Sequence, residues 1–101
     1  MIIYNVTVKV DQSISAEWLE WMNGTLIPEV MATGLFSDYR ICHLLDQEED
    51  QGITYVIQYT AETIEQYRQY EVRHAAALRE ASSTRFGPQC VAFRTLMAVI
   101  N

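Results

Sequence analysis

The C-terminal segment QCVAFRTLMAVI, residues 89–100, carries apolar side chains on both faces of the strand that it predicts. One face holds Val91, Phe93, Met97 and Val99, and the other holds Cys90, Ala92, Leu96, Ala98 and Ile100. A strand that is apolar on both faces needs cover on both sides of its sheet. Any fold of this chain must therefore provide two covering layers for its last strand.

Three earlier segments also predict strands. Residues 2–10, IIYNVTVKV, alternate strictly, and their even-numbered positions form the better core face. Residues 35–45 and 53–60 predict a second and a third strand. The acidic stretch DQEEDQG, residues 46–52, lies between them and is typical of a hairpin loop.

Residues 15–33 predict the first helix, with Ser15 as its N-cap. Its apolar stripe repeats every four residues: Trp18, Met22, Leu26 and Val30. Pro28 interrupts the pattern, because a proline inside a helix removes one hydrogen bond and clashes with the carbonyl of Gly24. The helix can kink, or it can end near Gly24 and restart with Thr25 as a second N-cap. We expect a broken or sharply bent helix.

A second helix is expected after Thr60, which is placed to cap it. The helix should lose its regularity through EASSTR, residues 80–85, and end at the FGP of residues 86–88. The resulting order β-α-β-β-α-β predicts a single α+β domain over residues 1–101, a ferredoxin-like sandwich. Its four antiparallel strands should lie in the order 4-1-3-2, with both helices on one face.

The predicted helices cover only one face of the sheet, whereas the last strand needs cover on two. A second copy of the chain is the simplest cover for the open face, because two-fold dimers are the commonest oligomers. We therefore expect a homodimer formed through the open sheet face, although an edge-to-edge dimer stays possible. Polar side chains on that face would then pair across the interface or line a small-molecule pocket between the sheets.

The charge balance disfavours two classes of partner. Seven Lys and Arg against 13 Asp and Glu give a net charge of −6. Nucleic acids and anionic membrane surfaces need a concentrated positive surface, so neither is expected as a partner. No apolar run approaches the roughly 20 residues that span a bilayer, and the N-terminus lacks the basic leader of a signal peptide. We expect a cytoplasmic protein.

Cys42 and Cys90 are expected to be free thiols on opposite edge strands. Three strand spacings would separate them by roughly 14 Å, beyond the roughly 7 Å between bridged Cα atoms. Two histidines and two cysteines, scattered along the chain, predict no metal site. No sequence motif predicts a cofactor.

The sequence singles out no catalytic centre. The candidate catalytic side chains are His43, which can titrate near neutral pH, and Arg94. The candidate ligand-facing residues are Asn5, Thr7, Gln58 and Arg94. Asn5, Thr7 and Gln58 are expected on the open sheet face, whereas the direction of Arg94 is left open because both faces of its strand are apolar.

Several stretches resemble a bacterial family of domains of unknown function, the DUF family numbered 4286. They are MIIYNVTVKVD, EWLEWM, IPEVMATG, TYVIQYT and FGPQCVAFRTLMAVI. The resemblance implies a ferredoxin-like protein of the dimeric α/β-barrel type and no established activity. The wider group includes cofactor-independent monooxygenases and isomerases, many with a histidine before the Ile-Pro of the first helix. Leu26 occupies that position here, which counts against inherited catalysis.

Three hypotheses follow. The chain is a homodimeric domain with a structural or small-ligand-sensing role. Alternatively, it is a cofactor-free oxygenase or isomerase for a small apolar substrate, in which Asn5, Thr7, His43 and Arg94 orient the substrate. A third possibility is a protein-interaction module that recruits a partner through an edge strand.

Overall fold

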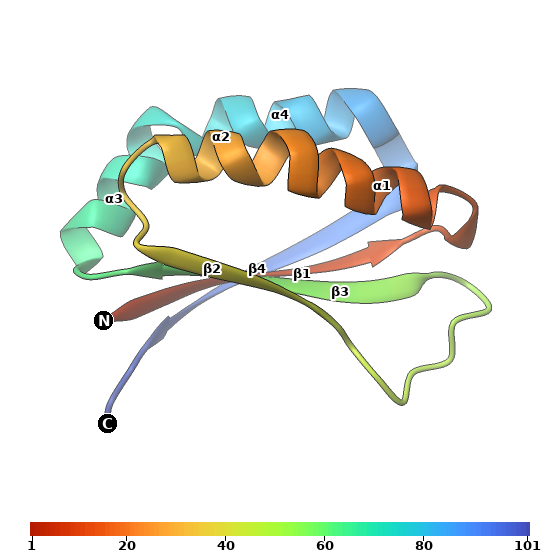
Figure 1. Cartoon of the computed structure of the whole chain (residues 1–101), viewed down its shortest axis with the longest axis horizontal. Helices are drawn as coiled ribbons and strands as arrows, with labels where there is room; N and C mark the ends of the chain where they lie inside the picture. The colour runs from red at the N-terminus through yellow and green to blue at the C-terminus, as the bar shows by residue number, and fades with distance from the viewer.

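The computed structural model describes residues 1–101 and has two layers, a four-stranded antiparallel sheet and a layer of helices on one face (Figure 1). The strands are β1 (Ile2–Val10), β2 (Asp38–His43), β3 (Ile53–Ala61) and β4 (Cys90–Ala98). The helices are α1 (Ser15–Trp21), α2 (Ile27–Ala32), α3 (Ile64–Arg73) and α4 (Ala75–Phe86). The sheet order β2-β3-β1-β4 confirms the predicted ferredoxin-like topology, since it reads 4-1-3-2 from the other edge.

The alternation along β1 and β3 decides which side chains form the core. Tyr4, Val8 and Val10 of β1 are buried under the helices, as are Tyr55, Ile57 and Tyr59 of β3. The register pairs Tyr4 with Tyr59 and Val6 with Ile57, so the apolar faces of the two central strands coincide. The core is completed by helix residues such as Trp18, Ile27 and Val30. The predicted core face of the first strand is confirmed.

Pro28 does not break the first helix. A π-helical turn, Met22–Leu26, joins α1 to α2, and the helical ribbon runs on without interruption (Figure 1). The N–H of Ile27 donates to the carbonyl of Met22, five residues earlier. The wider turn accommodates a residue that lacks the usual N–H and whose ring would clash with a carbonyl in an α-helix. The expected restart with Thr25 as a second N-cap is therefore wrong.

The predicted N-caps differ from the observed ones. Ser15 is already inside α1, where it is buried and its hydroxyl lies 2.7 Å from that of Tyr55. Thr60 belongs to β3, and Thr63 caps α3 through a capping box with Gln66. The side chain of Thr63 accepts from the Gln66 N–H at 3.3 Å, and the Gln66 side chain accepts from the Thr63 N–H at 3.3 Å. This reciprocal pair satisfies two of the free donors at the helix start.

The second helical segment begins at Ile64, later than expected, and contains an interruption that was not predicted. It breaks at His74, between α3 and α4, and α4 then continues to Phe86 instead of fading through residues 80–85. Serine and threonine have low helix propensity, but packing against the core outweighs that preference. Ala75 and Phe86, at the two ends of α4, are both buried.

The open face of the sheet is less uniformly apolar than expected. Its exposed large apolar side chains lie on β4 and just beyond it: Val91, Phe93, Met97 and Val99. β2 is shorter than the predicted 35–45, and its residues on this face are Asp38, Arg40 and Cys42. β3 adds Val56 among polar residues. The apolar surface is thus a band along the β4 edge, and no helix of this chain covers it (Figure 1).

Candidate functional site

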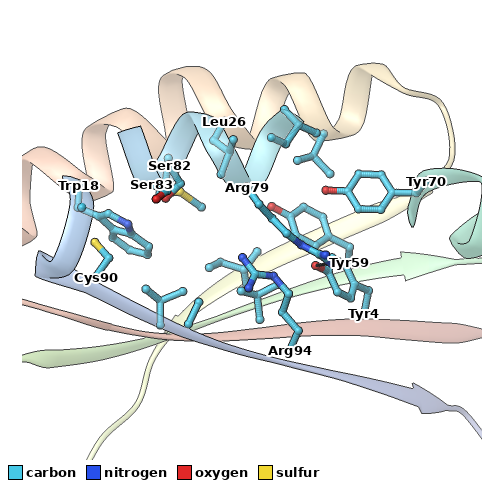
Figure 2. A pocket seen from close by; sticks show the side chains of 18 residues that line it. Tyr4, Trp18, Leu26, Tyr59, Tyr70, Arg79, Ser82, Ser83, Cys90 and Arg94 are labelled. Atoms are coloured by element: carbon cyan, nitrogen blue, oxygen red, sulfur yellow. Dashed lines mark hydrogen bonds between the residues drawn. The ribbon is translucent and has the colours of Figure 1, made fainter. Parts of the chain in front are cut away.

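A cavity of about 160 Å³ lies between the sheet and the helices (Figure 2). The cavity is lined by side chains from β1, β3, β4 and the four α-helices, and α3 contributes Tyr70. Most of the wall is apolar. Its apolar residues include Val6, Val8, Trp18, Met22, Leu26, Val30, Ile57, Leu78 and Ala92. The polar groups are Tyr4, Tyr59, Tyr70, Arg79, Ser82, Ser83, Cys90 and Arg94. The sequence predicted a pocket between two sheets, whereas this cavity lies on the other face.

The helical stripe predicted from the sequence forms one wall of this cavity. Trp18, Met22, Leu26 and Val30 all line it. The π-turn contains Met22 and Leu26, so the register shift beside Pro28 sets the angle at which these two side chains meet the sheet. Leu26 holds the position at which the family resemblance implies a histidine in many relatives, and it gives the cavity an apolar wall at that point.

Arg79 of α4 is held by a hydrogen-bonded network across the break at His74. Its two terminal nitrogens donate to the two oxygens of Glu71, each at 2.9 Å. One of them also donates to the Tyr4 hydroxyl at 3.0 Å, and Tyr67 donates to Glu71 at 2.8 Å. This bidentate pair neutralises the Arg79 charge. The Nε of Arg79, however, is buried and has no hydrogen-bond partner.

The network also shifts the pKa of its acidic members. Burial opposes ionisation of Glu71, but the hydrogen bonds from Arg79 and Tyr67 outweigh it and hold its pKa below the ordinary value. Burial and the hydrogen bond to Glu71 raise the pKa of Tyr67 to about 12. Glu71 is therefore a carboxylate at neutral pH, with both oxygens already accepting hydrogen bonds.

Tyr59 and Tyr70 of the cavity wall are neutral. Burial raises the pKa of Tyr59 and of Tyr70 well above the ordinary value, and neighbouring tyrosines add to the effect. Tyr4, Tyr59 and Tyr70 pack together, with ring centroids 6.0 Å apart for Tyr4 and Tyr59 and 5.8 Å apart for Tyr4 and Tyr70. The hydroxyls of Tyr59 and Tyr70 offer hydrogen bonds to a ligand without acting as bases at neutral pH.

Cys90 lines the cavity at the start of β4, near Trp18 in Figure 2. Burial raises the pKa of its thiol to about 11. A thiol with that pKa is almost wholly protonated at neutral pH, and the thiolate is the nucleophilic form. Cys90 therefore serves as a small apolar wall residue. Both Cys90 and Cys42 are free, on β4 and β2 at opposite edges of the sheet.

Arg94 lies on the helix side of the sheet, opposite Val6 of β1. Figure 2 shows its side chain reaching from β4 into the space below the helices. The residue is exposed and has no hydrogen-bond or ion-pair partner in the protein. Arg94 thus does not share a face with Asn5, Thr7 and Gln58, with which it was grouped as a ligand-facing candidate.

Asn5, Thr7 and Gln58 lie together on the open face of the sheet, as expected. Asn5 and Gln58 are directly paired across β1 and β3, and the Gln58 amide donates to Asn5 at 3.2 Å. The Asn5 amide in turn donates to the Thr7 hydroxyl at 3.2 Å. These bonds satisfy much of the polar capacity of the half-buried side chains. None of the three lines the cavity described above.

His43 lies at the end of β2, far from the cavity. Its Nε2 is 2.6 Å from a Glu49 carboxylate oxygen, and its ring packs 5.4 Å from the Tyr55 ring. β2 and β4 are opposite edges of the sheet, so the two catalytic candidates His43 and Arg94 are not brought together. The partner Glu49 belongs to the loop that follows His43 and was not predicted from the sequence.

Sequence reasoning missed Arg79, Glu71 and the tyrosine cluster as parts of one site. The eight-residue spacing between Glu71 and Arg79 gave no signal, because only residues three or four apart are neighbours on a helix and the two meet across the break at His74. Nothing in the sequence could bring Tyr4 of the first strand to Arg79, since that contact depends on how the helix layer packs on the sheet.

Solved structures similar to this chain share its fold at low sequence identity. An ethyl tert-butyl ether d (ethd) family protein from Bacillus halodurans has a TM-score of 0.68 and 11% identity, and the match covers 99% of this chain and 100% of that one. SnoaB, a cofactor-independent oxygenase from Streptomyces nogalater, has a TM-score of 0.61 and 13% identity, with 99% and 94% covered.

A dimeric ferredoxin-like protein from an uncultured marine organism has a TM-score of 0.65 and 8% identity, with 99% of this chain and 95% of that one covered. No curated protein matches the sequence. No helix of the structure is long and apolar enough to cross a membrane. The profile of one family, described as Domain of unknown function (DUF4286), matches residues 1–100. Because the match covers almost the whole chain, this protein belongs to that family.

Proposed function

We propose that this protein is a homodimeric domain that binds a small, largely apolar ligand in the cavity between its sheet and its helices. The observation that carries the proposal is the cavity itself, with its volume of about 160 Å³ and its mostly apolar lining. An engineered apolar cavity of about 150 Å³ binds benzene. Tyrosine, serine and arginine groups at a few positions would fix the orientation of the ligand, as in most small-molecule sites.

The side chains of the cavity favour binding over catalysis. Neither a carboxylate nor an imidazole lines it. Its titratable groups are tyrosines, a thiol and arginines, and burial raises the pKa of Tyr59, Tyr70 and Cys90. A general base must be deprotonated near the working pH, whereas burial keeps Tyr59, Tyr70 and Cys90 protonated there. A cofactor-free oxygenase or isomerase stays the alternative, supported by the shared fold of SnoaB, a cofactor-independent oxygenase.

The homodimer is supported by the apolar band on the open face. Phe93 is 66% exposed and Val91 is 53% exposed, on a sheet face that no helix covers. Exposed apolar bands of this kind mark association surfaces. One protein of the same fold is described as dimeric. Two free cysteines fit a reducing compartment such as the cytoplasm. β2 and β4 also leave edges for strand addition, which supports the interaction-module alternative less directly.

Benzene binding tests the proposed cavity function, with fluorescence of the buried, cavity-lining Trp18 as the readout. The wild-type protein should bind benzene saturably. Ala92→Phe should abolish this binding, because Ala92 lines the cavity and a phenyl ring would fill it. Ala98→Phe is the matched control, on the same strand and the same sheet face but outside the cavity. Absence of saturable binding, or equal binding by both variants, contradicts the proposal.

A further inference from the structure

Arg94 is the one cavity-lining cation whose charge the protein leaves uncompensated. Arg79, the other arginine of the wall, is paired bidentately with Glu71. Arg85 lies outside the cavity, 3.5 Å from Glu17. Arg94 has no such partner, although it extends from β4 into the cavity between sheet and helices (Figure 2).

The groups facing Arg94 do not neutralise it. Tyr70 on the cavity wall is neutral, and Arg79 adds a second positive charge. Glu71 is close enough for Arg94 to favour its ionised form, but both of its oxygens already accept hydrogen bonds from Arg79 and Tyr67. Arg79 and Glu71 together form a neutral pair, so Arg94 leaves the cavity wall with a net charge of +1. The whole chain, by contrast, has a net charge of −6.

A second donor of the cavity wall also lacks a partner. The Nε of Arg79 is buried and forms no hydrogen bond within the protein. Buried donors without partners are rare in folded proteins, and each one calls for an explanation. Because this atom is inaccessible, it does not face a ligand in the cavity, and Arg94 alone carries an unpaired positive charge on the wall.

The apolar part of the cavity wall limits the size and polarity of the part of the ligand that lies inside the cavity. Val6, Leu26 and Leu78 are among the apolar residues that surround a space of about 160 Å³. That space accommodates a body of roughly the size of a benzene ring. Guanidinium groups match the planar geometry of a carboxylate, to which they can donate two parallel hydrogen bonds. A phosphate monoester carries up to two negative charges at neutral pH, and only one arginine here is free to meet them.

The geometry points to a compact monocarboxylic acid as the ligand, with its carboxylate at Arg94 and its apolar body inside the cavity. This inference rests on the proposed function, because it names the chemical class that the same cavity accepts. The exposed position of Arg94 places the carboxylate at the solvent side, so the ligand can bind without losing all its hydration. The positive charge disfavours amines of the same shape.

Calorimetric titration with three compounds of similar shape tests the inference: benzoate, benzyl alcohol and benzylamine. The full-length wild-type protein should bind benzoate at least about tenfold more tightly than benzyl alcohol, since a hydrogen bond to a charged group is worth about 1.5 kcal/mol or more. Benzylamine should bind more weakly than benzyl alcohol. In Arg94→Gln the preference for benzoate should disappear, while benzyl alcohol still binds and reports an intact cavity.

Arg68→Gln is the matched control, because it removes the same charge from an exposed position of α3 that does not line the cavity. It should keep the wild-type preference. Equal affinity of the wild type for benzoate and benzyl alcohol, or the same loss in both variants, overturns the carboxylate inference and leaves the cavity function intact. Failure of all three compounds and of benzene to bind overturns both.

Discussion

Replacing Phe93 by threonine should strongly weaken the proposed homodimer. Phe93 is 66% exposed on the open face of the sheet. A phenylalanine side chain can bury about 200 Å², so roughly 130 Å² of Phe93 is available to a partner. At about 25 cal/mol per Å², this area contributes about 3 kcal/mol per protomer. A two-fold interface contains the residue twice, which sets an upper limit of about 6 kcal/mol.

The expected effect is smaller than this limit, because a partner covers only part of the side chain and threonine retains some apolar area. We expect the dissociation constant of the dimer to rise at least about 100-fold, which corresponds to about 2.7 kcal/mol. Threonine keeps a high strand propensity, so β4 itself should persist. Sedimentation equilibrium over a range of concentrations measures the dissociation constant.

Val72→Thr provides the matched control. Val72 is 85% exposed but belongs to α3, on the side of the molecule away from the open sheet face. This variant should dimerise like the wild type. A wild-type protein that is monomeric at about 100 μM, where even an interface of only about 5.5 kcal/mol would be half populated, refutes the reasoning. So does a Phe93→Thr protein that dimerises as tightly as Val72→Thr.

Three further predictions concern stability. Ile57→Ala should lower the free energy of unfolding by about 2–5 kcal/mol in chemical denaturation, because Ile57 is 1% exposed; a loss below that of Val72→Ala would contradict its central place in the core. Thr63→Ala should cost about 1 kcal/mol in the same assay, by removing the capping box of α3, and an unchanged midpoint would count against this role. The pKa values of Cys90 (about 11, ordinarily 9.0) and Tyr67 (about 12, ordinarily 10.0) are both raised. The folded state therefore binds more protons at these two groups, so stability should be constant from neutral pH to about pH 9.0 and fall as the pH rises toward 11; Cys90→Ala should flatten that fall, and a wild-type stability that is flat or rising in this alkaline range would refute the assignment.

The sequence determined the parts of the fold that depend on local geometry. The alternation of residues 2–10 identified both the strand and its buried face, because successive side chains of a strand point to opposite sides. The four-residue repeat from Trp18 to Val30 identified the inner face of the first helix for a similar reason. With the order of the elements, these patterns left one common topology, and the sheet order confirms it.

Where local sequence preferences conflicted, the packing of the folded chain decided which secondary structure formed. Pro28 predicted an interruption, but a single π-turn preserves the helix while its inner residues stay against the sheet. Thr60 and Thr63 are both suitable caps, and the length of β3 selects Thr63. Serines and threonines in residues 80–85 disfavour a helix, yet α4 continues because burial of Phe86 at its end outweighs their propensities.

The site depended on tertiary structure throughout. β4 is apolar on both faces, so its own pattern cannot tell which face the helices cover; the pairing of Arg94 with Val6 places that arginine on the helix side. The contact between Tyr4 and Arg79 joins residues 75 positions apart. Periodicity reports which side chains share a face, because it arises from the geometry of one segment. Which faces meet, and what space they leave between them, is set by packing of distant segments, and that information exists only in the folded chain.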